Sequence, residues 1–293
     1  MQRRLVKKLA AMSEGKEVAF NAILKDFFDI DCFSAQIVIA THSPNILRKS
    51  HTELVRFFAS ETGGLEVVNG ADVALRFSPR KHFLDRFEFV REAFFVKRVL
   101  LVEGTSEAMA LPLLADTMGI DVDDCGLLVL QVGGKESLVP AKELLDAFKI
   151  KCMIIEDRDE GQASSTGDVR TTDRRDFEDE IVEELFANGM QDILCEVMKR
   201  YGQDPEHLIV PKGQLNKYAT KIGFSEFDND IAVSTLLVNG RLLCTDDSKA
   251  AMYAWLSKNK CGILWALLSA SIPLYCIPTC YQAVLQSAAG IAI

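Results

Sequence analysis

The sequence predicts an α/β protein built on a parallel sheet, because short apolar runs alternate with helical stretches. The runs cover residues 99–102, 127–132 and 153–155, and the helical stretches cover 106–118 and 136–148. A short apolar run without alternation is typical of a strand that is buried on both faces, as in parallel sheets. The order strand, helix, strand, helix, strand predicts parallel strands that are joined by right-handed crossovers.

Carboxylates gather just after the first and third of these runs. Glu103 and Glu107 follow the first run, and Asp157 and Asp159 follow the third. Open α/β sheets bind their ligands at the carboxyl ends of their strands. Four carboxylates that converge there repel one another unless a cation lies between them, and oxygen-only ligands suit Mg²⁺ or Mn²⁺. The sequence therefore predicts a divalent-metal site at this edge of the sheet.

The two acidic clusters together resemble a known signature. Residues 103–107, Glu-Gly-Thr-Ser-Glu, followed about fifty residues later by Asp157-Arg-Asp159, are similar to the Toprim motif of topoisomerases, primases and OLD-family (overcoming lysogenization defect) nucleases. The lead-in 92–104 and the segment 108–115 resemble the OLD version in particular. The resemblance implies a Toprim (Rossmann-like) parallel sheet flanked by helices, which we place at residues 95–190.

The resemblance also implies the residues of the site. Two divalent ions, Mg²⁺ or Mn²⁺, would be held by acids at strand ends and at helix starts: Glu103, Glu107, Asp157, Asp159 and Glu178. Glu103 would in addition be catalytic and assist proton transfer. The alternative for Glu103, Asp157 and Asp159 is that they cap a helix or hold a turn. For Glu178 the alternative is that it stabilises the helix dipole from the first turn.

A lysine is expected to act beside the metal ions. The end of the chain resembles the closing segment of OLD proteins, in which a lysine precedes an apolar helix and an Ile-Pro turn follows. Lys260 matches that lysine best, and Lys258 is the second choice. By the resemblance, Lys260 would be catalytic and would stabilise negative charge in the transition state. The alternative is an ordinary surface lysine.

The amino-terminal segment resembles part of an ABC-type ATPase. A predicted strand from Ala35 ends in Thr41-His42-Ser43-Pro44, which is similar to the switch-histidine segment, and residues 1–9 resemble the helix after the Walker B strand. The chain has no Gly-x-x-x-x-Gly-Lys-[Ser/Thr] loop, so ATP is not expected to bind this chain alone. We interpret residues 1–80 as an ATPase remnant, left by truncation or by gene splitting. His42 is then either a relic or a residue that faces the ATP of a partner.

The rest of the chain is interpreted from local signals. Runs 54–59 and 65–68 flank a Glu-Thr-Gly-Gly turn and predict a hairpin. Residues 162–167, rich in Ser, predict a flexible loop. Residues 191–293 predict a helical extension that packs on the Toprim domain. Its last part, 261–293, has no charged residue and is long enough to span a membrane, but two prolines interrupt it and favour two buried helices joined by a turn.

Composition restricts the class of protein. The formal charge of −9 argues against a surface that is uniformly adapted to nucleic acid. Three local basic residues, Lys212, Lys217 and Lys221, are either phosphate contacts or a solvated helix face. The eight cysteines are spread singly, which argues against a zinc site and a disulfide framework. Because charges crowd the first eight residues, no signal peptide is indicated, and we expect a cytoplasmic protein with reduced thiols.

Together these features predict a metal-dependent DNA endonuclease, which nicks or cleaves DNA by two-metal phosphodiester hydrolysis in phage defence or DNA processing. DNA and a second copy of the chain, in a homodimer, are the expected partners, and no membrane is expected. The alternative is a non-catalytic or partner-dependent fragment, a regulatory module of a split OLD-type ATPase–nuclease with a separate ATPase subunit. A topoisomerase or a primase fits less well, because no tyrosine has the context of a DNA gate and no zinc-binding template module is visible.

Overall fold

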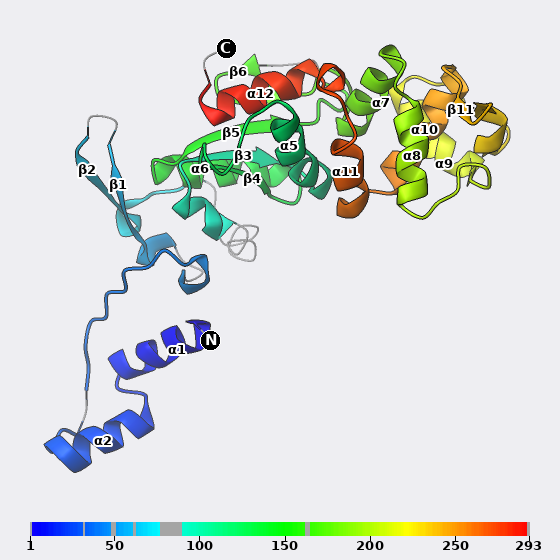
Figure 1. Ribbon diagram of the computed structural model, residues 1–293. Helices are drawn as coiled ribbons and strands as arrows, with labels where there is room; N and C mark the ends of the chain where they lie inside the picture. Colours follow the sequence, from blue (N-terminus) through cyan, green and yellow to red (C-terminus); the bar gives the residue numbers. More distant parts are fainter. Residues whose placement is uncertain are drawn as a thin grey trace. The chain divides into compact units, whose positions relative to one another are not determined.

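The computed structural model describes residues 2–31, 33–47, 51–60, 63–76, 90–161 and 165–291. The chain divides into two compact units, Met1–Ala74 and Leu75–Ile293 (Figure 1). The second unit therefore contains both the expected Toprim domain and the expected helical extension. The boundaries predicted near residues 80, 95 and 190 stay predictions.

The first unit consists of helices followed by a hairpin. Its elements are the helices α1 (Gln2–Ser13) and α2 (Val18–Phe28), the 3₁₀ turns η1 (Pro44–Ile46), η2 (His51–Glu53) and η3 (Gly70–Asp72), and the strands β1 (Val55–Ala59) and β2 (Leu65–Asn69). β1 and β2 pair antiparallel, so the expected hairpin is confirmed. In its turn the Ser60 N–H donates to the Gly64 carbonyl at 2.7 Å, while residues 61 and 62 lie outside the described residues.

The strand expected before the Thr-His-Ser-Pro segment is not formed, and that prediction was wrong. Residues 35–41 have no regular secondary structure. Val38 is 87% exposed, and its neighbours Ile37 and Ile39 are also exposed. A strand of this composition is stable only between neighbouring strands and under layers that cover both of its faces. Among the described residues of this unit, only the β1–β2 hairpin forms a sheet, and residues 35–41 do not pair with it.

The second unit is built on a five-stranded sheet in the order β4-β3-β5-β7-β6. The strands are β3 (Arg98–Val102), β4 (Leu127–Gln131), β5 (Lys151–Glu156), β6 (Ser165–Thr166) and β7 (Val169–Thr171). The first four in this order are parallel, and β6 closes the edge antiparallel to β7. This confirms the predicted parallel α/β sheet. Residues 162–164 of the predicted loop lie outside the described residues, and β6 occupies the loop's next two positions.

The inner strand β3 is buried on both faces, as its composition predicted. Val99 is 1% exposed, and Leu100, Leu101 and Val102 are fully buried. Right-handed crossovers that run from β3 to β4 and then back across to β5 place α5 (Thr105–Thr117) and α6 (Leu138–Ala147) on opposite faces. The carboxyl ends of β3 and β5 are therefore adjacent. The chain leaves β3 toward β4 on one side and returns to β5 on the other side.

The segment after the sheet supplies most of the helices. They are α7 (Phe177–Ala187), α8 (Asp192–Arg200), α9 (Lys212–Tyr218), α10 (Asp246–Lys258), α11 (Gly262–Ser269) and α12 (Thr279–Ala289). Four short strands were not predicted and form two antiparallel pairs, β8 (Ile209–Val210) with β9 (Ile231–Ala232) and β10 (Leu237–Val238) with β11 (Arg241–Leu242). Of the helices in the described ranges, none combines the length and the apolar character that a membrane crossing needs.

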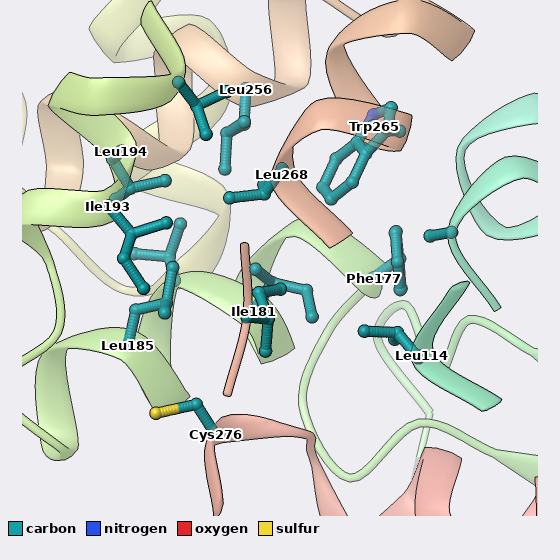
Figure 2. Packing of buried hydrophobic residues seen from close by; sticks show 14 of the residues in the cluster. Leu114, Phe177, Ile181, Leu185, Ile193, Leu194, Leu256, Trp265, Leu268 and Cys276 are labelled. Carbon is teal, nitrogen blue, oxygen red and sulfur yellow. The ribbon is translucent and has the colours of Figure 1, made fainter. Parts of the chain in front are cut away.

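The final helix returns to the sheet, so the end of the chain helps to enclose the region of the strand ends. α12 contacts β3, β5 and α5, and lies along the sheet beside α5 in Figure 1. Figure 2 shows how α7, α8, α10 and α11 pack through Ile181, Leu194, Leu256 and Leu268. This cluster is continuous with Leu100 and other side chains of the sheet. Burial of this shared apolar surface stabilises the position of α7 and α10 against the sheet.

Candidate metal centre

Glu103 and Asp157 lie side by side because β3 and β5 are neighbours in the sheet. The Asp157 N–H donates to Glu103 Oε1 at 3.0 Å. The backbone of Glu103 is fixed in turn, since its carbonyl accepts the N–H groups of Gly133 and Gly134 after β4. Burial raises the pKa of the Glu103 carboxyl, and the N–H of Asp157 opposes this rise. The two predicted acidic clusters, which follow the first and third apolar runs, thus meet as the strand order requires.

Glu107 lies in the first turn of α5 and is 8% exposed. Gly104 precedes this helix in an extended conformation, and a Cβ at that position would lie 3.2 Å from Glu107 Oε2. Glycine therefore leaves room for the carboxylate to fold back over the start of its own helix. Burial raises the pKa of Glu107 to about 7, and the nearby Glu178 carboxylate adds to the rise.

Asp157 connects the end of β5 to the start of α7. Its Oδ1 accepts the Phe177 N–H at 3.1 Å. Burial, together with the charges of Glu107, Asp176 and Glu178, raises the pKa of Asp157 to about 9. An aspartate with such a pKa is protonated at neutral pH unless a cation compensates its charge.

Glu178 is the most buried of the predicted ligands, at 1% exposure. Its Oε2 lies 3.0 Å from Lys260 Nζ, and its Oε1 accepts a 3.4 Å hydrogen bond from Ser106 Oγ. Burial raises the pKa of Glu178, while Lys260 opposes the rise. The structure therefore brings Lys260 to Glu178 from 82 residues away. Lys260 and the second choice, Lys258, are both exposed, and it is Lys260 whose ammonium reaches the buried carboxylate.

Asp159 has different surroundings from the other predicted ligands. Its backbone is in the left-handed region, with φ of 55°, and its side chain is 55% exposed. Its Oδ2 lies 3.0 Å from Lys135 Nζ, and the same ammonium donates to the Asp157 carbonyl at 2.6 Å. Sequence reasoning did not select Lys135. The sequence feature that could have indicated Lys135 is the Gly133-Gly134 pair. This pair turns the chain directly after β4, so that the Lys135 side chain faces the end of β5.

Asp176 is a further carboxylate of this region that sequence reasoning missed. It caps α7, since its Oδ1 accepts the Asp179 N–H at 2.9 Å. Its Oδ2 accepts a 2.6 Å hydrogen bond from the hydroxyl of Tyr253 on α10. Its charge raises the pKa of both Asp157 and Glu178. The available signal was its place in the acidic run 173–180, from which only Glu178 was chosen.

The other acids of that run hold the loop before α7. Asp179 Oδ2 accepts the Arg175 N–H at 3.2 Å, and Glu180 Oε1 accepts the Arg174 N–H at 2.5 Å. Both carboxylates are buried, at 8% and 3% exposure. The run therefore divides between residues that face the strand ends and residues that fold the loop back onto the helix. This division depends on contacts that no spacing in the sequence reveals.

Potential metal ligands also occur beside this loop. Among the described residues, Asp173, Glu180 and Cys280 place one ligand atom each within 4.8 Å of one another, and the predicted carboxylates form no such group. Burial raises the pKa of the Cys280 thiol, and Glu180 already accepts a backbone hydrogen bond. We therefore interpret the Cys280 cluster as a loop anchor.

The predicted acids fit a hard cation by their chemistry. Glu107, Asp157 and Glu178 are carboxylates with raised pKa values that repel one another in a largely buried region. Burying several carboxylates is costly without compensating charge, and Lys260 supplies one positive charge for three acids. A divalent ion held by these residues would compensate the remainder.

Two other groups of predicted residues belong to other segments of the chain. His42 belongs to the first unit, where Thr41 Oγ1 accepts the Ser43 N–H just before η1. Lys212, Lys217 and Lys221 are exposed on α9 and the 3₁₀ turn that follows it, η6 (Ala219–Ile222). The Lys221 carbonyl accepts a hydrogen bond from the Arg175 guanidinium, which joins this segment to the loop before α7.

One comparison with known proteins covers the segment that contains β3, β5 and their carboxyl ends. Residues 94–159, which span β3 to the end of the Asp157 cluster, match the family model described as "Overcoming lysogenization defect protein-like, TOPRIM domain". The chain carries an OLD-like Toprim domain. Toprim domains as a class bind divalent metals, which is consistent with the chemistry of the acids at β3 and β5.

Individual relatives are more distant. An "OLD nuclease" from Thermus scotoductus is 27% identical over 171 residues, which are 56% of this chain and 32% of that protein. The chain thus spans about a third of the length of this relative. The C-terminal region of the Burkholderia pseudomallei OLD protein has 15% identity and a TM-score of 0.43, covering 66% of this chain and 96% of that one. That of the Xanthomonas campestris OLD protein has 18% identity and a TM-score of 0.43, covering 67% and 94%.

Proposed function

We propose that the OLD-like Toprim domain is a divalent-metal-dependent endonuclease that hydrolyses phosphodiester bonds in DNA. One observation carries the proposal: largely buried carboxylates from the end of β5 and from the first turns of α5 and α7 gather together, and a lysine 82 residues further along the chain pairs with one of them. Glu107, Asp157 and Glu178 are the acids, and Lys260 is the lysine. The domain match and the nuclease relative support the same class of activity.

The chain's own residues would bind the metal ions, accept a proton and neutralise charge on the phosphate. Glu103, Glu107, Asp157, Asp159 and Glu178 would hold two ions of Mg²⁺ or Mn²⁺. Such a pair of ions activates water and compensates charge on the phosphate. Glu103, whose Oε1 accepts the Asp157 N–H at the β3 end, would accept a proton. Lys260 keeps its ammonium charged beside Glu178, because ion pairing outweighs the lowering of its pKa by burial, and it would neutralise a phosphate oxygen.

Plasmid cleavage tests this function directly. Supercoiled DNA is incubated with the purified chain in Mg²⁺, Mn²⁺ or EDTA, and nicked and linear products are separated on a gel. Asp157→Asn removes a predicted ligand with little change of volume, and Asp228→Asn removes an exposed acid as the matched control. We expect metal-dependent cleavage that the first variant loses and the second keeps. Equal cleavage by both variants would exclude this site.

A partner-dependent module is the second candidate, and one observation favours it. The described part of the first unit contributes no side chain to the hydrophobic core, and α2 has no buried residue. On the hairpin, Val55, Phe57 and Leu65 are 52%, 63% and 74% exposed. Apolar elements of this kind are stable when another chain or domain covers them. We propose a separate ATPase subunit as that cover.

The two candidates differ in what restores activity. A folded chain that leaves plasmid intact with either metal, but cleaves after the addition of an ATPase subunit, would establish the second. Light scattering on the chain alone tests the proposed homodimer in the same experiment. A function in phage defence or DNA processing, in the cytoplasm, remains part of the proposal.

A further inference from the structure

Tyr253 links the helical extension to the candidate metal centre. It lies on α10, is 1% exposed, and donates its hydroxyl hydrogen to Asp176 Oδ2 at 2.6 Å. The partners come from segments 77 residues apart in the sequence. A short hydrogen bond from a phenol to a carboxylate is among the stronger hydrogen bonds in proteins. The pair is therefore a specific connection between α10 and the start of α7.

Both oxygens of Asp176 are used. Oδ1 accepts the Asp179 N–H as the cap of α7, and Oδ2 accepts the Tyr253 hydroxyl. Because each oxygen has a different partner, the carboxylate cannot rotate without breaking one of the two bonds. Its orientation, and that of the first turn of α7, are fixed from two sides.

The fixed carboxylate stands beside residues of the proposed site. Phe177, the next residue, donates its N–H to Asp157, and Glu178 follows with its ion pair to Lys260. The charge of Asp176 acts electrostatically on Asp157, Glu178 and Lys260. A displacement of Asp176 would therefore move two groups together: the Phe177 N–H, which donates to Asp157, and the carboxylate of Glu178.

We propose that Tyr253 is a positioning residue of the metal centre, acting through Asp176 to hold the start of α7 against the end of β5. The inference rests on the proposed function, because it assumes that Asp157 and Glu178 hold metal. It assigns α10 a role in the site, although no residue of α10 is among the proposed ligands. Residues outside the ligand set that orient it are typically worth 10–100-fold in metal affinity.

Metal binding measured without DNA tests the proposal. Mn²⁺ affinity is determined from the electron paramagnetic resonance signal of free Mn²⁺, for the wild-type chain and for Tyr253→Phe, which removes one oxygen atom. Tyr218→Phe, a phenol lost from α9, is the matched control. We expect affinity to fall about 10–100-fold in Tyr253→Phe and to stay unchanged in the control. Unfolding in EDTA reports the stability of each variant separately.

A double-variant cycle separates positioning from simple packing. If Tyr253 acts through Asp176, the loss in Tyr253→Phe should disappear when Asp176 is already Asn. A Tyr253→Phe variant that unfolds earlier in EDTA but binds Mn²⁺ as tightly as wild type would overturn the proposal, as would additive losses in the double variant. A wild-type chain that binds no Mn²⁺ would instead refute the proposed function, and this inference with it.

Discussion

Replacing Asp157 by Asn should abolish cleavage and yet stabilise the metal-free protein. Asparagine has nearly the same volume, and its Oδ1 can still accept the Phe177 N–H. What the change removes is a carboxyl group whose ionisation burial and the neighbouring acids disfavour. Asp157, which would bind a divalent ion, therefore lowers the stability of the protein when no ion is bound.

The magnitude follows from the raised pKa. Asp157 has an ordinary pKa of 3.8 and a pKa of about 9 in the folded chain. Because the pKa of Asp157 is raised in the folded chain, its contribution to the free energy of unfolding is fully present below pH 3.8. That contribution is lost as the pH rises from 3.8 toward 9. At pH 7 the difference is about three pKa units, or at most about 4 kcal/mol. Since Glu107 and Glu178 share the same repulsion and relax when one charge is removed, we expect about half, roughly 2 kcal/mol.

Thermal and urea unfolding in EDTA measure this prediction. At pH 7, Asp157→Asn should unfold about 4–8 °C above wild type, and the difference should shrink toward zero at pH 4. With saturating Mn²⁺ the order should reverse, because wild type gains binding free energy that the variant lacks. A variant that is less stable than wild type in EDTA at pH 7, or equally shifted at both pH values, would refute the electrostatic reasoning.

Two further variants test the lysine and the glycine beside the acids. Lys260→Met leaves Glu178 buried without its ion-pair partner, so cleavage should fall at least about 100-fold in a plasmid assay. Its free energy of unfolding at pH 7 should fall by about 2 kcal/mol in urea titrations, with the loss shrinking at pH 4, where Glu178 is protonated; an unchanged value at pH 7 would contradict the pairing. Gly104→Ala should weaken Mn²⁺ binding several-fold in calorimetry, because its Cβ crowds Glu107 Oε2 at 3.2 Å. The same change should alter stability by less than about 0.5 kcal/mol, and unaltered affinity would show that Glu107 does not depend on the space at Gly104.

Strands and helices of the Toprim domain were predictable because each is determined by a local pattern. Four apolar residues in a row at 99–102 indicate burial on both faces, and the structure buries them. Since parallel strands end at the same edge, the positions of Glu103 and Asp157 followed from the sequence as well.

The N-terminal segment shows where the same reasoning failed. The run from Ala35 is as apolar as a buried strand, yet it forms none. A strand is stabilised by hydrogen bonds to neighbours and by the layers that cover it, and the described part of its unit supplies neither. Composition indicates the environment that a segment needs, but it does not show whether that environment is present.

By itself the sequence determined the parallel sheet and the edge at which its acids meet, because these depend on periodicity and chain order, and the family resemblance predicted Lys260. Only the tertiary structure decided which acids are buried together, that Asp159 pairs with Lys135, and that Tyr253 holds Asp176. Those contacts join residues up to 77 positions apart. The physical reason is that the sheet brings distant strand ends and helix starts within hydrogen-bonding distance, where desolvation and neighbouring charges set the chemistry of each group.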